Sequence, residues 1–231
     1  MQVASSPIVL GDKSKAAPWY SIEARITPEA REMLQEYAGI PPEDVKDHIL
    51  TTDLRRLVHD GVDSAKTVAV ELEQGYIDAG YELFRDRDTL RTRFVNADML
   101  DDRSAELDAL EGSFDTAHLG LCLHLWNREE QMVVLGRVIR LLKQKPGVVI
   151  LGHAAGHADG IDVPGVANRP ALRHNQESWE KMWADISKQT GTKWELKTEV
   201  SDYPGTREPE GRPSWWDKDM RFLGFEVTRV E

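Results

Sequence analysis

Short apolar runs alternate with amphipathic segments along most of the chain after residue 60. Short runs bounded by turn residues are typical of buried strands, and apolar positions three or four residues apart indicate helices. Strands are predicted at 67–72, 93–98, 114–119, 148–152, 193–198 and 222–230, and helices at 76–84, 104–110, 128–143 and 174–189. This alternation is the pattern of βαβ units, so the chain is predicted to form an α/β fold around a mostly parallel sheet.

The same spacing predicts which helix positions face the core. In the helix at 128–143 the inward positions are expected to be Val133, Val134, Val138, Leu141 and Leu142. Trp179 and Trp183, four residues apart, should share one helix face. The last two strands are expected to close the sheet as an antiparallel hairpin. Segment 152–173, rich in glycine, proline and polar residues, is expected to be an irregular connection that shapes a pocket.

Before this pattern, three short helices are predicted at 27–37, 41–49 and 53–59. A threonine followed by proline at residue 27 carries the signals of a helix start. In the third helix, Asp53, Arg55 and Arg56 are expected on the helix surface rather than in a ligand site. The chain is therefore predicted to consist of an N-terminal helical arm or lid at 1–50 and an α/β domain at 51–231.

Composition narrows the class of partner. The chain has 231 residues and a formal net charge of −11, from 29 basic and 40 acidic residues. An acidic protein repels nucleic-acid phosphates and anionic membranes, so a small molecule is the expected partner, with no nucleic acid and no membrane. No run approaches the length of a bilayer span, and residues 1–15 lack the features of a secretory signal. These features predict a cytoplasmic protein, with a homodimer as its expected assembly.

The single cysteine, Cys122, lies in an apolar run and can form no disulfide within the chain. We expect it to be a buried core residue rather than a reactive thiol.

Two acidic residues close the predicted strand at 67–72. Glu71 and Glu73 stand where nucleotide-binding α/β folds carry a carboxylate that accepts hydrogen bonds from ribose hydroxyls. Such folds place a glycine-rich turn ahead of this acid, because glycine lets the backbone approach the ligand closely. Residues 46–57, which precede the strand, contain no glycine. The sequence thus predicts half of a nucleotide site, and a solvated strand end is the alternative interpretation of both acids.

The order of several motifs resembles the S-adenosylmethionine-dependent methyltransferases, in particular a fungal group of secondary metabolism that tailors meroterpenoids and polyketides. The likeness extends over nearly the whole chain and rests on ITPEAREML at 26–34, YAGIP at 37–41, DLRRL at 53–57, GYIDAGYELFRD at 75–86, AD at 97–98, LHL at 123–125, KPG at 145–147, RHN at 173–175 and TGTKWE at 190–195. The resemblance implies a Rossmann-like sheet, mostly parallel with a C-terminal antiparallel hairpin, and S-adenosylmethionine as cofactor. In this family a strand and a glycine-rich loop precede the Asp-Leu-Arg-Arg helix, whereas here residues 48–52 run directly into it. The chain is therefore expected to lack the usual first strand.

The resemblance also implies roles for particular residues. The implied cofactor-binding residues are Glu71, which would accept hydrogen bonds from the ribose hydroxyls, Leu72 beside it, and Ala97, Asp98 and Met99 around the adenine ring. His118 corresponds to the strand end that lies beneath the sulfonium. The methyl acceptor would be a carboxylate or hydroxyl oxygen of a small molecule.

Histidine is the natural general base for such a reaction, in which alignment of the reacting groups supplies most of the acceleration. The candidate catalytic residues are His118 and His153, with a structural role in or near a strand as the alternative for His118. The candidate substrate-binding residues are His157, His174, Trp215 and Trp216.

A metal site is the competing interpretation for the segment that holds His153, His157, Asp159 and Asp162. Histidines four residues apart meet only on a helix, and glycines at 152, 156 and 160 oppose a helix there. No metal is expected.

Three functions stay open at this point. The first is O-methylation of a small molecule by a methyltransferase of fungal secondary metabolism. The second is a homologue that keeps the fold but not the cofactor, and acts as a cyclase, an isomerase or a binding protein. The third is an inactive, truncated methyltransferase.

Overall fold

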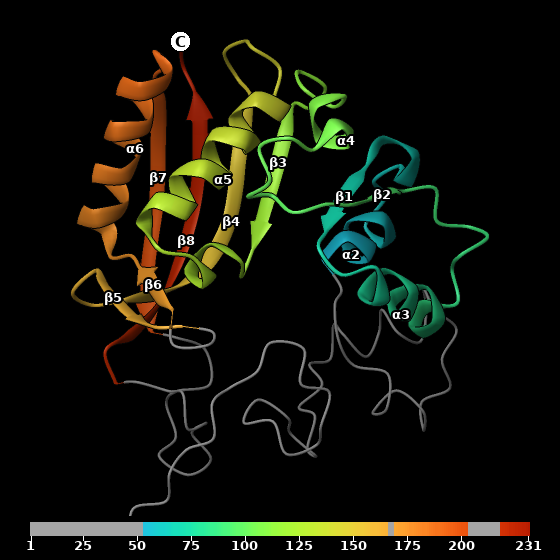
Figure 1. Ribbon diagram of the computed structural model, residues 1–231, viewed down its shortest axis with the longest axis horizontal. Coiled ribbons are helices and arrows are strands. Elements are labelled where there is room, and N and C mark those ends of the chain that lie inside the picture. The colour runs from blue at the N-terminus through green and yellow to red at the C-terminus, as the bar shows by residue number, and fades with distance from the viewer. Residues whose placement is uncertain (1–52, 166–168, 203–217) are drawn as a thin grey trace, which may run out of the picture. The chain divides into compact units, whose positions relative to one another are not determined.

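The computed structural model describes residues 53–165, 169–202 and 218–231 (Figure 1). The chain divides into two compact units. The small unit is residues 21–109, described from 53 on, and the large unit is residues 1–20 with 110–231, described from 110 on. The arm predicted at 1–50, with its helices at 27–37 and 41–49, and Trp215 and Trp216 lie outside the described residues.

One βαβ unit forms the frame of the small unit. Its described elements are α2 (Asp53–His59), η2 (Ser64–Lys66), β1 (Val68–Glu71), α3 (Gln74–Phe84), β2 (Arg93–Asn96) and α4 (Ala105–Asp108). β1 and β2 pair in parallel, from Val68 opposite Arg93 to Glu71 opposite Asn96. The apolar run predicts a buried β1, but all four of its residues are only half-buried. Among the described residues β1 pairs with β2 alone, so one side of the strand has no neighbour there.

A buried ion pair links α2 to the residues after α3. The Arg55 guanidinium donates to both carboxylate oxygens of Asp86, at 2.8 and 3.0 Å, and the two side chains are 6% and 4% exposed. The guanidinium also lies 4.5 Å from the ring centroid of Phe84. Gly80 leaves room for it, because a Cβ there would come within 3.2 Å of a guanidinium nitrogen. The prediction that Arg55 lies at the surface is therefore wrong, since its planar fork finds a carboxylate and a ring inside the unit.

The large unit is built on a four-stranded sheet. Its elements are β3 (Thr116–Gly120), η3 (Leu123–Leu125), α5 (Arg128–Leu141), β4 (Val149–His157), β5 (Ile161–Pro164), β6 (Pro170–Arg173), α6 (Gln176–Thr190), β7 (Trp194–Asp202) and β8 (Met220–Arg229). The strand order is β3-β4-β8-β7, with β3 and β4 parallel and β8 antiparallel to both of its neighbours. This arrangement confirms the α/β class and the C-terminal antiparallel hairpin of β7 and β8.

Helices α5 and α6 pack on one face of this sheet (Figure 1). Trp179 and Trp183 of α6 are buried, as their spacing predicts, and Trp179 lies 4.7 Å from the ring of Phe225 on β8. Both helices begin with a capping box, formed by Asn127 in α5 and Asn175 in α6. One inward position was predicted incorrectly. Val133 is 47% exposed. The buried face of α5 runs through Val134, Leu135 and Val138 instead, and Val133 lies outside it.

Two further differences concern the segment after residue 148. β4 does not end at Gly152 but continues to His157, because β8 pairs with it along its whole length, as far as Met220 opposite His157. The segment 152–173, expected to be irregular, contains the end of β4 and the antiparallel hairpin of β5 and β6. The extension of β4 depends on pairing with residues far away in the sequence rather than on local composition. Within the described ranges, none of the helices has the length and apolar character that crossing a bilayer requires.

Candidate active site

The predicted cofactor-binding residues come together at the carboxyl ends of β1 and β2. Glu71 is the last residue of β1, and Ala97 follows β2 and donates its backbone N–H to the carbonyl oxygen of Glu71 at 3.1 Å. Asn96 holds the two strand ends together, because its amide nitrogen donates to the carbonyl oxygens of Glu71 and Leu72 at 3.0 and 2.7 Å. Parallel strands bring these residues to one edge, as the sequence predicts.

Each of the two carboxylates at this edge is held by one backbone group. An oxygen of Glu71 accepts from the N–H of Glu73 at 2.9 Å, and an oxygen of Asp98 accepts from the N–H of Leu100 at 2.8 Å. The second oxygen of each carboxylate is left to accept a hydrogen bond from a ligand hydroxyl or amine. Leu72 is 58% exposed beside them and Met99 is half-buried. These two carboxylate acceptors suit the sugar hydroxyls and the base amine of a nucleoside.

The amino-acid part of S-adenosylmethionine finds no comparable partner in the described small unit. Before β1 the sequence contains glycine only at positions 11, 39 and 61. Gly61, with φ +105°, lies in the turn between α2 and η2 that leads to the amino end of β1, whereas Glu71 lies at the carboxyl end. The described residues therefore fit the nucleoside portion of the cofactor and not its methionine portion.

A row of three aromatic rings crosses the sheet of the large unit. His153 on β4 stacks on Phe222 of β8, with ring centroids 5.2 Å apart and an interplanar angle of 26°. His118 on β3 lies on the other side, 6.0 Å away at 57°. The structure thus brings the two predicted catalytic histidines together. Strand register places all three side chains on the face opposite Phe225, and so opposite α6.

The turn after β3 supports this part of the site. Leu121 has a φ of 50°, a strained conformation for a residue with a side chain, and its N–H donates to the carbonyl oxygen of His153 at 2.8 Å. In the following η3, His124 accepts a hydrogen bond from the N–H of Ala155 at 3.2 Å. Burial lowers the pKa of His124 to about 4, with the charges of Arg173 and His153 acting in the same direction. His124 is therefore a neutral acceptor at physiological pH.

The two other predicted site residues that the structure describes, His157 and His174, are buried in the large unit. His157 is 4% exposed and accepts a hydrogen bond from the N–H of Asp159 at 3.1 Å. His174 uses both ring nitrogens inside the protein, with the Ser178 hydroxyl at 2.9 Å and the Gln131 amide oxygen at 3.0 Å. Burial lowers the pKa of His174 to about 4, with a smaller contribution from the charge of Arg128. Their roles in substrate binding stay predictions.

Cys122 is half-buried, and not fully buried in the core as the sequence predicts. Burial raises the pKa of its thiol to about 11, which favours the protonated form.

One residue in each unit contributes to the arrangements described above without a signal in the sequence. Phe222 lies in an ordinary apolar strand pattern, and only the register of β8 against β4 brings it onto His153. Asn96 lies inside the strand predicted at 93–98, and its hydrogen bonds to the carbonyl oxygens of Glu71 and Leu72 depend on the pairing of β1 with β2. Once the register is known, the alternation of side chains along a strand places Phe222 on the same face as His153.

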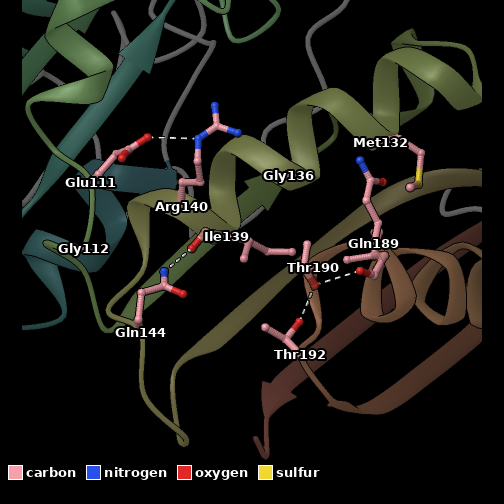
Figure 2. A pocket seen from close by; sticks show the side chains of 11 residues that line it. Glu111, Gly112, Met132, Gly136, Ile139, Arg140, Gln144, Gln189, Thr190 and Thr192 are labelled. Atoms are coloured by element: carbon pink, nitrogen blue, oxygen red, sulfur yellow. Dashed lines mark hydrogen bonds and ion pairs between the residues drawn. The ribbon is translucent and has the colours of Figure 1, made fainter.

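A groove of about 630 Å³ lies between α5 and α6 (Figure 2). Its polar side chains are mostly engaged with the protein. Arg140 donates to Glu111 at 2.9 Å, the hydroxyls of Thr190 and Thr192 are 2.6 Å apart, and Gln144 donates to two backbone carbonyls. No histidine or cysteine lines the groove, and its one lining carboxylate, Glu111, is paired with Arg140.

One family description and several curated relatives match this chain. Residues 19–55 match the meroterpenoid methyltransferase N-terminal domain. The O-methyltransferase phiE of a fungal species is 39% identical over 165 residues, which cover 69% of this chain and 54% of that protein. The O-methyltransferase atr3 of Stereocaulon alpinum is 29% identical over 272 residues, covering 94% and 77%. The Asnovolin E/Chermesin D methyltransferase nvfJ of Aspergillus novofumigatus is 29% identical, covering 63% and 52%.

These matches confirm the predicted family. The chain belongs to a fungal family of S-adenosylmethionine-dependent methyltransferases associated with secondary metabolism. The matched region spans about half the length of most of these relatives, 54% for phiE and 52% for nvfJ. The alignment with atr3, at 272 residues, is longer than the 231 residues of this chain, so that relative carries internal segments that this chain lacks.

One solved structure is that of Burkholderia thailandensis 1,6-didemethyltoxoflavin-N1-methyltransferase with bound 1,6-didemethyltoxoflavin and S-adenosylhomocysteine. The fold of this chain is similar to that structure with a TM-score of 0.49 and a sequence identity of 16%, and the match covers 78% of this chain and 67% of the other.

Proposed function

We propose that this chain is a methyltransferase of fungal secondary metabolism that methylates a carboxylate or hydroxyl oxygen of a small molecule. The observation that carries the proposal is the pairing of His118 and His153 at neighbouring parallel strands, next to a strained turn. Catalytic groups in α/β folds gather at the carboxyl ends of parallel strands, and strained backbone marks functional sites. The printed names of phiE and atr3 as O-methyltransferases support oxygen as the acceptor.

His153 is the residue that would accept the proton of a hydroxyl substrate, and His118 beside it would bind the same substrate. A carboxylate substrate carries no such proton and needs only alignment. S-adenosylmethionine supplies the methyl group in this family. Because the described residues fit its nucleoside part alone, we assign no step of the reaction to a residue that would hold its methionine part.

The missing glycine-rich turn favours a second function. In this alternative the chain keeps the fold but binds the cofactor weakly. It then acts as a cyclase, an isomerase or a binding protein, or it is an inactive truncated methyltransferase. The internal segments that atr3 has and this chain lacks support this alternative.

Incubation of the full chain with methyl-labelled S-adenosylmethionine separates the two functions. The acceptors are a panel of aromatic carboxylic acids and matched phenols. Label in an organic product supports the methyltransferase, and release of that label by mild base identifies a methyl ester rather than an ether. Absence of labelled product with every acceptor, in a chain that unfolds cooperatively, contradicts the methyltransferase and supports the second function.

We also infer that the protein works in the cytoplasm on a small-molecule substrate and that it assembles as a homodimer. Light scattering coupled to size exclusion tests the assembly, and a mass of one 26.1 kDa chain would contradict the dimer.

A further inference from the structure

Phe222 contributes no chemically reactive group, yet it makes the closest ring contact of His153. Its phenyl ring lies 5.2 Å from the imidazole and is inclined by only 26°, so the two rings are stacked. His118 approaches from the neighbouring strand at 6.0 Å and 57°. His153 therefore stands between two rings that come from β3 and β8.

The strand register explains how Phe222 reaches this position. Gly224 is directly opposite His153, and Phe222 is two residues further along β8 on the same face. Diagonal neighbours on antiparallel strands are within reach of aromatic side chains. Gly224 has no side chain, and the Phe222 ring extends toward the space above it, with its Cε1 3.9 Å from where a Cβ of residue 224 would stand. This is an ordinary van der Waals distance, so the diagonal register, and not the missing Cβ of residue 224, brings the phenyl ring against the imidazole.

The backbone of His153 is fixed by hydrogen bonds to the elements on both sides of it. Its carbonyl oxygen accepts from the N–H of Leu121 in the strained turn, and its strand is paired on both sides, with Gly120 and with Gly224. With the backbone fixed, the remaining freedom of His153 is rotation of its side chain. A ring stacked on the imidazole face restricts that rotation and leaves the ring edge, which carries the nitrogens, to face a ligand.

We propose that Phe222 is a positioning residue for His153, and that its stacking holds the imidazole edge toward the methyl acceptor. This inference rests on the proposed function for the catalytic consequence, and on the ring geometry alone for the positioning. A general base must stay within hydrogen-bond reach of the proton it removes, and small displacements of a catalytic group cost large factors in rate.

The test combines a double-mutant cycle with a spectroscopic measurement on the full chain. Phe222→Leu is expected to lower kcat about tenfold while KM changes less than about twofold, and Phe222→Tyr, which keeps the ring, is expected to stay close to the original. In a His153→Gln background, Phe222→Leu is expected to have no further effect on kcat, because the group that it positions is already gone. Additive losses, or equal losses in the leucine and tyrosine variants, would overturn the proposal.

Nuclear magnetic resonance of the His153 imidazole separates this inference from the proposed function. Loss of the Phe222 ring current is expected to shift the ring proton signals of His153 in Phe222→Leu and to leave them in place in Phe222→Tyr. The control is Phe94→Leu, which removes a ring from the Tyr81 contact in the small unit and should leave these signals unchanged. If the chain transfers no methyl group, this signal still decides the positioning. Unmoved His153 resonances in Phe222→Leu overturn it whatever the activity.

Discussion

The two compact units bury their strands to very different degrees. In the large unit β4 and β8 are each paired on both sides, and one face of their sheet is covered by α5 and α6, so that Ile150, Leu223 and Val227 are at most 1% exposed. In the small unit β1 pairs only with β2 among the described residues, and none of its four residues is fully buried. Parallel sheets ordinarily need cover on both faces.

This difference shows what holds each unit together. The large unit depends on apolar burial between helices and sheet, with two indole rings at its centre. In its described part, residues 53–109, the small unit buries fewer apolar side chains than the large unit does and adds a buried ion pair, Arg55 with Asp86. We therefore expect the two units to respond to different substitutions.

The largest expected effect is the loss of an indole from the large unit. Trp179 is fully buried against Phe225 and His174, so Trp179→Ala should lower the free energy of unfolding by about 4 kcal/mol. Urea unfolding followed by tryptophan fluorescence measures this, because Trp183 and Trp194 remain as reporters. The matched control is Glu180→Ala, an exposed neighbour on the same helix, with an expected change below about 0.5 kcal/mol. Equal effects of the two substitutions on the free energy of unfolding would contradict the statement that α6 and the sheet form the core of the large unit.

A smaller effect is expected when the ion pair of the small unit is broken. Arg55→Ala leaves the Asp86 carboxylate buried without its partner and should cost about 3 kcal/mol. Hydrogen exchange read by mass spectrometry should show faster exchange in peptides from residues 53–109, with the large unit unchanged. Replacing both partners, Arg55→Met with Asp86→Leu, should restore most of the protection. Unaltered exchange in Arg55→Ala would mean that the pair does not hold α2 in place.

The smallest of these effects is a pH dependence confined to the large unit. The pKa values of His124 and His174 are lowered to about 4 in the fold, mainly by burial, from an ordinary value of 6.5. The unfolded chain therefore binds more protons between pH 6.5 and 4. The contribution of each neutral imidazole to stability is complete above pH 6.5 and is lost as the pH falls to 4. At pH 5 each histidine taken alone should have lost about 2 kcal/mol of this contribution.

The variant His124→Asn tests this pH dependence. Asparagine can accept the Ala155 N–H and does not titrate in this range. Urea unfolding at pH 7.5 and at pH 5 should therefore show a smaller difference in stability for the variant than for the original chain. An unchanged difference would exclude His124 as a source.

The comparison also explains which features the sequence could predict. β1, β2, β3 and β8 are apolar runs bounded by turn residues, so local pattern is enough to place them. The extension of β4 through Gly-His-Ala-Ala-Gly-His has no strand-like composition and forms because β8 pairs with it. The meeting of Glu71 with Ala97 was predictable, since parallel strands end at one edge. The stacking of Phe222 on His153 was not, because it depends on the register of two strands far apart in sequence.

We propose that the carboxylate of Glu71 binds the sugar of an adenosine group and that no residue of the described part of the small unit binds the methionine portion. Calorimetric titration of the full chain with S-adenosylmethionine and with 5′-methylthioadenosine, which lacks the amino-acid tail, tests it most directly. We predict dissociation constants within about threefold of each other, both weakened about tenfold by Glu71→Gln through loss of a charged hydrogen-bond acceptor, and unchanged by the exposed control Glu82→Gln. Tight binding of S-adenosylmethionine alone, or binding that Glu71→Gln does not weaken, would contradict the claim.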